Sequence, residues 1–141
     1  MDKLIEFATN HIILVSLLAA ISVMLLWNLF GSALSGIRQL SPAEVTRLIN
    51  RENAVLLDVR NANEYQKGHI LNSINVPDAE LATRLESLEK HKNKTVITYC
   101  EFGNTSGKAA RSLKTAGFEQ IYSLKGGIGA WRSANLPLTK E

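Results

Sequence analysis

The chain has 141 residues, with 16 Lys and Arg against 13 Asp and Glu and a net charge of +3, a length that suggests one globular domain. The basic residues are scattered and not interleaved with aromatic residues, which argues against nucleic-acid binding. The single cysteine excludes an internal disulfide and a cysteine-rich metal site, and the three histidines lie far apart, without ligand spacing. We therefore expect no metal, and a lone thiol favours a reducing compartment.

The N-terminal segment is so apolar that we expect it not to be part of the globular domain. Residues 12–37 carry no charge, and their core, Ile12 to Phe30, has only two serines and one asparagine as polar interruptions. A membrane-spanning helix needs about 20 apolar residues, and Trp27 and Phe30 lie near one end, as aromatic residues at a membrane interface do. The sequence predicts one transmembrane helix over residues 12–30.

A cleaved secretory signal is the alternative interpretation of this segment. Ala33 and Ser35 have the small-residue spacing that a signal peptidase prefers. However, the apolar part of a signal usually runs for only about 7–15 residues and follows a basic start. The start here contains Asp2 and Glu6 as well as Lys3, so we favour an uncleaved anchor.

The flanking charges predict the orientation of this helix. Lys3 is the only basic residue before it, whereas Arg38, Arg47 and Arg51 follow it closely. Lys and Arg are enriched on the cytoplasmic side of membrane helices. We therefore expect a single-pass protein of the cell (inner) membrane of a bacterium, with its C-terminal domain in the cytoplasm.

The rest of the chain alternates between strand and helix patterns. Residues 31–39 are typical of a short flexible linker, so we expect an anchor and linker over 1–38 and one domain over 39–141. Ser41, Pro42 and Glu44 form a capping box that starts a helix. We predict strands over residues 54–59, 73–76, 95–100 and 121–124, and further helices over 78–91, 106–117 and 126–134. Such alternation indicates an α/β fold with a mostly parallel sheet covered on both faces.

The only cysteine ends one of these predicted strands, at the edge where open parallel sheets bind ligands. The loop that follows Cys100 consists of Glu101, Phe102, Gly103, Asn104, Thr105 and Ser106. Gly103 can adopt a positive φ, so the loop can curl with its N–H groups inward at a helix N-terminus, which stabilises an anion. A thiolate nucleophile is therefore one interpretation of Cys100, and a small buried hydrophobic residue is the other.

Three segments resemble signatures of the rhodanese (sulfurtransferase) family in its single-domain form. They are Leu56–Pro77, Tyr99–Ala110 with the cysteine loop, and Gly117–Trp131, and the resemblance extends over nearly all of residues 40–138. It implies a parallel sheet of about five strands flanked by helices. It also implies that Cys100 takes sulfur from a small-molecule or protein-bound donor as a persulfide and passes it to a thiol or a protein acceptor, without a cofactor.

The resemblance also suggests roles for other residues. The loop residues 101–106 would bind the substrate, and Asp58, Arg60, Glu64 and His69 would form a buried supporting network rather than an acid–base set, because buried charges must be paired. Many active members of the family have arginine or another non-acidic residue directly after the cysteine, where this chain has Glu101. A carboxylate turned toward the pocket would oppose the thiolate and an anionic donor, which makes thiosulfate a doubtful donor.

Two other functions fit parts of the same pattern. Dual-specificity phosphatases of a related fold need an arginine six positions after the cysteine to bind phosphate, and Ser106 occupies that position here. A non-catalytic domain that docks a partner at the membrane is the stronger alternative, since Glu101 weakens the case for the usual donors.

Overall fold

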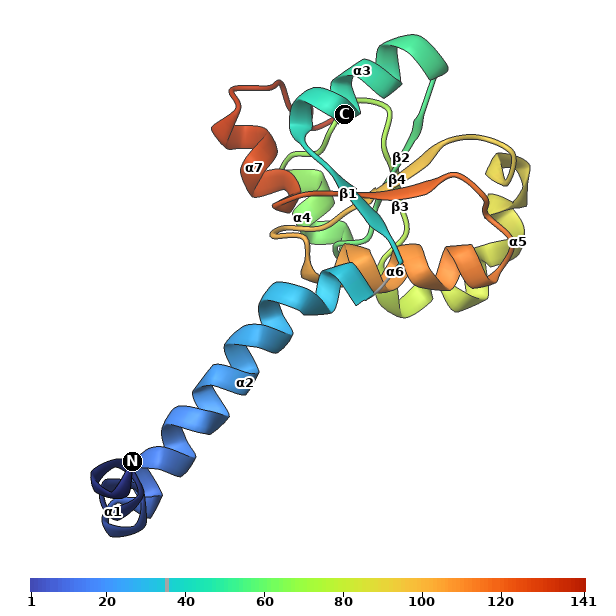
Figure 1. Ribbon diagram of the computed structural model, residues 1–141. Helices are drawn as coiled ribbons and strands as arrows, with labels where there is room; N and C mark the ends of the chain where they lie inside the picture. Colours follow the sequence, from blue (N-terminus) through green and yellow to red (C-terminus); the bar gives the residue numbers. More distant parts are fainter. Residues whose placement is uncertain (35) are drawn as a thin grey trace. The chain divides into compact units, whose positions relative to one another are not determined.

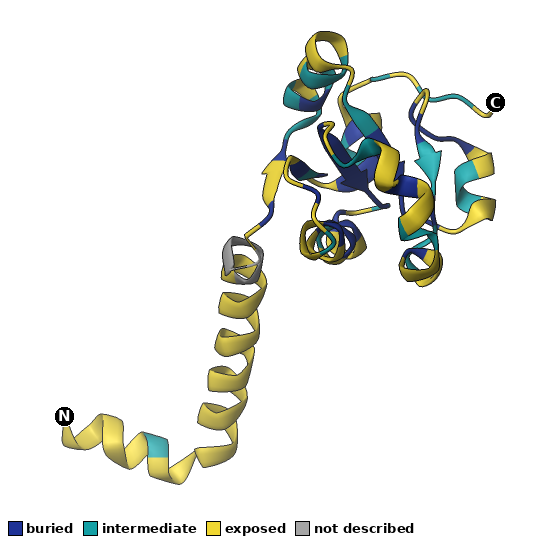
Figure 2. Ribbon diagram, turned by 90° about the vertical axis from the view of Figure 1, so that its right-hand side faces the viewer, coloured by how far each residue is buried: buried dark blue, intermediate teal, exposed yellow. Residues whose placement is uncertain are grey.

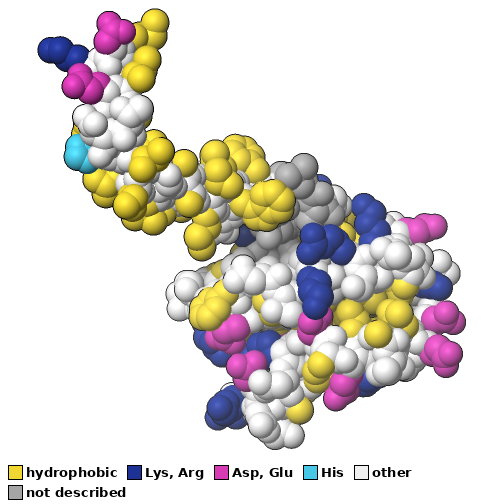
Figure 3. All heavy atoms as spheres, turned by 90° about the horizontal axis from the view of Figure 1, so that it is seen from below, with side chains coloured by type: hydrophobic (Ala, Val, Ile, Leu, Met, Phe, Trp, Pro, Cys, Tyr) yellow, Lys and Arg dark blue, Asp and Glu magenta, His cyan; other side chains and the backbone are white. Residues whose placement is uncertain are grey.

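The computed structural model describes residues 1–34 and 36–141, which divide into two compact units, Met1–Leu34 and Ser35–Glu141 (Figure 1). The N-terminal unit consists of α1 (Asp2–Asn10) and α2 (Ile12–Leu34), separated at His11. No residue of α1 is buried, and no part of Ile12–Phe30 is buried, as the exposed colouring in Figure 2 shows. On the face shown in Figure 3, apolar side chains lie along α2, whereas charged side chains gather at α1. By length and composition α2 can cross a membrane, a criterion that a signal sequence near the N-terminus also meets.

The second unit is built on a five-stranded parallel sheet in the order β1-β5-β4-β2-β3. The strands are β1 (Arg38–Leu40), β2 (Val55–Asp58), β3 (Ile74–Asn75), β4 (Val96–Tyr99) and β5 (Ile121–Leu124). The central strands β2 and β4 pair from Val55↔Val96 to Asp58↔Tyr99. This arrangement confirms the predicted fold class.

Helices cover both faces of the sheet (Figure 1). The α-helices of this unit are α3 (Pro42–Glu52), α4 (Ala62–Lys67), α5 (Leu85–Leu88), α6 (Asn104–Thr115) and α7 (Gly127–Ser133), of which α4 has no buried residue. Leu57 packs with Leu113 of α6 and Leu88 of α5 in one apolar cluster, whereas its neighbour Leu56 packs with Val45 of α3 in a second cluster that also includes α7. Successive strand residues point to opposite faces, so each buried strand supplies both clusters.

The predicted capping box at the start of α3 is confirmed. The Ser41 backbone N–H donates to Glu44 Oε2 at 2.8 Å, and the Glu44 N–H donates to Ser41 Oγ at 3.3 Å. The hydrogen bonds from the Ser41 backbone and side chain lower the pKa of Glu44. These bonds satisfy donors that the first turn of a helix otherwise leaves without a partner.

The predicted linker over residues 31–39 is wrong at both of its ends, and residues 31–34 are the last turn of α2. Residues 38–40 form β1, which pairs with β5, and Ile37 belongs to the buried core. The expected domain boundary between residues 38 and 39 therefore falls inside a strand, and the globular unit begins at residue 35. Three residues are too few to show an alternating pattern, and the partner strand lies about 80 residues away, as the pairing Arg38↔Tyr122 shows.

The predicted helix over residues 78–91 is also corrected. This region consists of three 3₁₀ helices, Asp78–Glu80, Ala82–Arg84 and Glu89–His91, together with the four-residue α5. Hydroxyl groups in it bond to carbonyls three residues earlier, Thr83 Oγ1 to Glu80 and Ser87 Oγ to Arg84. Such side-chain bonds compete with a regular helix.

Candidate active site

Cys100 lies directly after β4, and its side chain is enclosed by the loop that leads into α6. The residue is 6% exposed. Its Sγ accepts hydrogen bonds from two backbone N–H groups, that of Gly103 at 3.0 Å and that of Ser106 at 3.4 Å. Two N–H donors at the start of a helix favour negative charge on the atom they surround, so the geometry suits a thiolate or a persulfide.

The loop holds its curled shape through Gly103 and Ser106. Gly103 has φ +97°, and a Cβ there would lie 3.3 Å from the backbone nitrogen of Gly126, so a larger residue would be strained in both backbone and packing. The buried Ser106 hydroxyl bonds to the Gly103 carbonyl at 3.3 Å and to Ser123 Oγ at 2.8 Å. Thr98 Oγ1 donates to the Ser106 carbonyl at 2.8 Å. The loop is thus tied to β4 and β5.

The N-terminus of α7 supports the same loop from another direction. Its N–H groups at Ile128 and Gly129 donate to the carbonyls of Cys100 and Glu101, at 2.9 and 3.1 Å. Gly127 has φ +62°, and a Cβ there would collide with the backbone of Cys100 and Glu101. The family resemblance includes Gly126 and Gly127 in its third segment, but the contact of α7 with the cysteine loop was not predicted from the sequence. Two adjacent glycines at the start of a helix are nevertheless a signal of a close backbone approach.

A pocket of about 180 Å³ opens beside Cys100. It is lined by Val59, Arg60, Glu64, Cys100, Glu101, Phe102, Asn104 and Thr105. Four of the six predicted loop residues thus line the pocket, while Gly103 and Ser106 contribute backbone N–H groups to Cys100. Phe102 is 72% exposed, so the pocket carries an aromatic ring that is open to solvent.

Arg60 connects the pocket to a buried carboxylate. Its Nε lies 3.1 Å from both oxygens of Asp58, and its Nη2 donates to Asp58 Oδ2 at 2.7 Å and to the Gly68 carbonyl at 2.8 Å. The Arg60 side chain is only 3% exposed. Burial alone would lower its pKa, but the hydrogen bonds and the charge of Asp58 raise the pKa of Arg60 overall. Arg60 is therefore a permanently charged member of the pocket wall.

Glu101 lies between two arginines. Its Oε2 accepts from Arg60 Nη1 at 3.3 Å and its Oε1 from Arg132 Nη1 of α7 at 2.9 Å. The carboxylate that sequence analysis identified as a departure from the family pattern thus lines the pocket with its charge paired. Nothing in the local sequence around Arg132 pointed to this contact.

The other predicted supporting residues occupy different places. Glu64, at the start of α4, lines the pocket, and among the described residues no cation lies within ion-pair distance of its carboxylate. His69 does not line the pocket: its Nδ1 lies 2.8 Å from the Tyr65 carbonyl, and its ring stacks on the Tyr65 ring at 3.6 Å. No group of three His, Cys, Asp or Glu side chains within the described chain could hold a metal ion.

Tyr99, the residue before the cysteine, is fully buried, and the sequence did not predict a role for its side chain. Its hydroxyl accepts from the Ile70 N–H at 3.2 Å and lies 2.8 Å from Ser73 Oγ. Arg60 lies over its ring, at 5.8 Å from the centroid. Burial and then the charge of Asp58 raise the pKa of Tyr99, so it stays neutral and fixes the end of β4.

Comparison with known proteins places these features in a family. The family model described as Rhodanese-like domain matches residues 41–134. The Escherichia coli protein YibN is 38% identical over 141 residues, which cover 99% of each chain. Thiosulfate sulfurtransferase GlpE of Pseudoalteromonas translucida is 36% identical over 97 residues, 69% of this chain and 90% of the relative. The crystal structure of a rhodanese-related protein from Thermoplasma volcanium superimposes with a TM-score of 0.67 at 33% identity and covers 74% of this chain and 99% of that one.

Proposed function

This chain belongs to the rhodanese-like domain family, and on that premise we propose that it is a sulfurtransferase that carries sulfur as a persulfide on Cys100. The proposal depends on the position of Cys100 Sγ, which accepts hydrogen bonds from two backbone N–H groups and lies beside an open pocket. Relatives named as thiosulfate sulfurtransferases support the reaction class.

The first half-reaction loads the cysteine. The Cys100 thiolate attacks the outer sulfur of the donor, a new S–S bond forms, and the donor's own bond to that sulfur breaks, so that its remainder leaves with the electron pair. With thiosulfate the leaving group would be sulfite. The N–H groups of Gly103 and Ser106 point at Sγ, which carries the negative charge of the attacking thiolate. This is the preorganised stabilisation that nucleophilic catalysis requires, and after the transfer the charge lies on the outer sulfur of the persulfide, next to Sγ.

The second half-reaction releases the sulfur. An acceptor thiolate, small or borne by a protein, attacks the outer sulfur of the Cys100 persulfide, and the Cys100 thiolate leaves. No net oxidation or reduction occurs in this exchange. Because the thiolate is restored, the same two N–H groups serve both half-reactions.

Mass spectrometry of the intact protein tests this function. After incubation with thiosulfate, 3-mercaptopyruvate or a protein persulfide, we expect the mass of one added sulfur on Cys100, which cyanide removes. The Cys100→Ser variant is the matched control and should gain no sulfur. If no donor loads the protein, and if a Cys100→Ala variant replaces the wild type in cells, the chain is a docking domain and the proposal is wrong.

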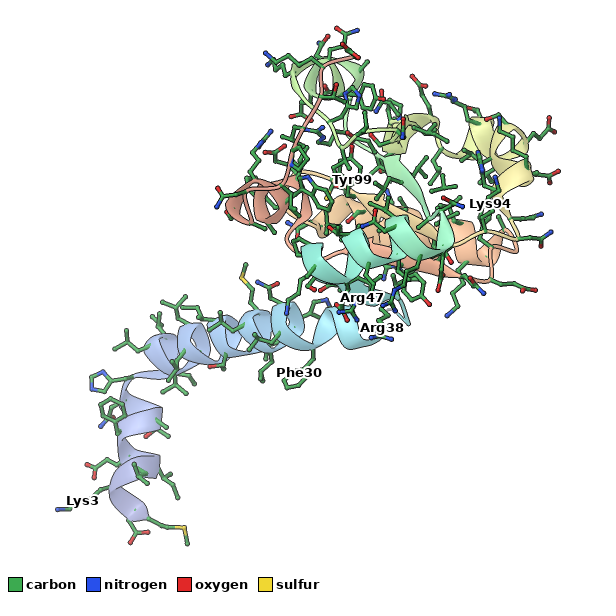
Figure 4. The ribbon with its side chains drawn as sticks, turned by 90° about the horizontal axis from the view of Figure 1, so that it is seen from above. Lys3, Phe30, Arg38, Arg47, Lys94 and Tyr99 are labelled. Atoms are coloured by element: carbon green, nitrogen blue, oxygen red, sulfur yellow. The ribbon has the colours of Figure 1, made fainter. Side chains whose placement is uncertain are left out.

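We further propose that α2 anchors the domain in the membrane with the domain in the cytoplasm. The support is the exposed apolar stretch Ile12–Phe30, with Lys3 on α1 and Phe30 toward the other end of α2 (Figure 4), and with Arg38, Arg47 and Arg51 beyond. We expect the protein to remain in membranes after alkaline carbonate extraction, whereas a variant without residues 2–34 should be soluble and still accept sulfur. A mature chain that begins near residue 35 would show instead that the segment is a cleaved signal.

A further inference from the structure

We propose that Glu101 is a specificity-determining residue that directs the site away from free dianionic donors such as thiosulfate. The sulfur would then come from donors with at most one negative charge and an organic body, such as thiosulfonates and organic persulfides. This inference rests on the proposed function of Cys100, and it concerns which donor that cysteine accepts.

The pocket wall carries more acidic than basic side chains. Among the residues that line the pocket, Arg60 is the only cation, and Glu64 and Glu101 are both carboxylates. An incoming dianion therefore meets two acidic side chains and one basic one. Charges that line a small, partly enclosed pocket are not fully screened by solvent.

Arg60 already donates hydrogen bonds to oxygens of the protein. Each of its three side-chain nitrogens donates to a protein oxygen: Nε and Nη2 to the buried Asp58, Nη2 also to Gly68, and Nη1 to Glu101. Nη1 carries two N–H groups and only one of them donates to Glu101, so a donor anion could receive a single hydrogen bond from Arg60 beside the Glu101 carboxylate. The pocket thus lacks the bidentate guanidinium that best binds an oxyanion.

Hydrogen bonds from two arginines hold the Glu101 carboxylate in place. Its second partner, Arg132, lies outside the pocket lining and is 47% exposed, while Glu101 itself is 33% exposed. The two arginines keep the carboxylate at the pocket without enclosing it in protein. Arg132 is therefore a positioning residue that acts through Glu101.

The pocket offers two backbone N–H groups and an aromatic ring to a sulfur donor. The N–H groups of Gly103 and Ser106 can stabilise one sulfur-centred charge. The exposed ring of Phe102 offers an apolar surface beside them, which an organic donor can contact and thiosulfate cannot. A donor with a single charge and a carbon body therefore matches the wall better than a dianion does.

Two donors that differ mainly in charge provide the test. Thiosulfate is a dianion, and the methanethiosulfonate anion has a methyl group in place of one oxygen and a single negative charge. Each transfers its outer sulfur to the Cys100 thiolate, and the leaving groups are sulfite and methanesulfinate. The quantity to measure is the ratio of kcat/KM for thiosulfate to kcat/KM for methanethiosulfonate, with cyanide as the acceptor for the full chain in detergent.

We expect Glu101→Gln to raise this ratio about fivefold, because removal of one negative charge favours the dianion more than the monoanion. The salt dependence should change as well: kcat/KM for thiosulfate should fall more steeply with ionic strength in Glu101→Gln than in the wild type. A purely structural role of Glu101 would lower both donors alike and leave the salt dependence unchanged.

Two further variants make the test specific. Arg132→Gln removes a cation that partly neutralises Glu101 and should lower the ratio about twofold, opposite to the effect of Glu101→Gln. Glu119→Gln changes an exposed carboxylate that precedes β5, at the end of the strands opposite to the end that carries Cys100. This variant should leave the ratio unchanged.

The outcomes separate this inference from the proposed function. If both donors load Cys100 but the ratio in Glu101→Gln stays within twofold of the wild type, the inference about Glu101 is overturned while the sulfurtransferase function stands. If neither donor adds sulfur to the wild-type protein or to Glu101→Gln, the proposed function fails and the inference fails with it.

Discussion

Apolar side chains in the two units of this chain have opposite surroundings. In the N-terminal unit Leu18 is 66% exposed and Trp27 is 75% exposed, whereas in the globular unit Leu113 and Ile97 are fully buried. Burial of one such side chain contributes about 1.5–3 kcal/mol. The globular unit gains this free energy from its own two apolar clusters, but α2 gains it only from an apolar medium. A leucine is therefore a buried core residue or an exposed apolar residue according to the unit in which it lies.

The largest expected effect comes from removing a side chain that the core encloses. Leu113→Ala should lower the free energy of unfolding of the globular unit by about 2–5 kcal/mol, because it leaves a cavity between α6 and the sheet. Leu18→Ala removes the same atoms from α2 and should change it by less than about 0.5 kcal/mol. Urea unfolding in mild detergent, followed by the fluorescence of the buried Trp131 in a Trp27→Phe background, measures both. Equal losses would show that α2 packs on the domain.

A second pair of variants compares two glycines of the globular unit, Gly127 with closely packed surroundings and Gly107 with open ones. Gly127→Ala should destabilise the protein by about 2–4 kcal/mol, because its Cβ would strike the cysteine loop at a backbone conformation with φ +62°. Gly107 lies within α6, and a Cβ added there would have no other atom within 4 Å. Gly107→Ala should therefore stabilise the protein by about 0.5–1 kcal/mol.

Sulfur loading distinguishes these two glycine variants further. We expect Gly127→Ala to load more slowly, since α7 holds the carbonyls of Cys100 and Glu101, and Gly107→Ala to load at the wild-type rate. Normal loading and stability in Gly127→Ala would contradict the role of α7 as a support for the loop.

The smallest expected effect concerns a local interaction that needs no tertiary contact. Ser41→Ala should lower the free energy of unfolding by about 1 kcal/mol at pH 7, because it removes the side-chain cap of α3. The pKa of Glu44 is lowered from its ordinary value of 4.5 by hydrogen bonds to Ser41. A depressed carboxyl pKa contributes stability above pH 4.5 that is lost as the pH falls through the folded-state value. Unfolding at pH 7 and pH 3 should therefore show a larger cost of Ser41→Ala at pH 7, and a pH-independent cost would contradict this coupling.

Most of the fold could be predicted because its signals are local. Four of the five strands, the capping box of α3 and the helix before Gly117 follow from apolar runs, caps and breakers within a few residues. The strand β1 could not be predicted in this way, because a three-residue edge strand depends on β5 for its hydrogen bonds. The region 78–91 had the expected apolar spacing, with Leu81 and Leu88 buried, but not the expected helix, because spacing fixes which side chains face the core and not the hydrogen bonds of the backbone.

By itself, the sequence determined that an apolar helix precedes an α/β domain and that one cysteine ends a strand before a glycine-containing loop. Only the tertiary structure decided the electrostatic surroundings of that cysteine. Glu101 meets Arg60 across 41 positions of the chain and Arg132 across 31, and the glycines that open α7 approach the loop from a different element. Contacts of this kind depend on how strands and helices pack, and no local pattern records them, so the charge of the pocket emerged only when the chain was folded.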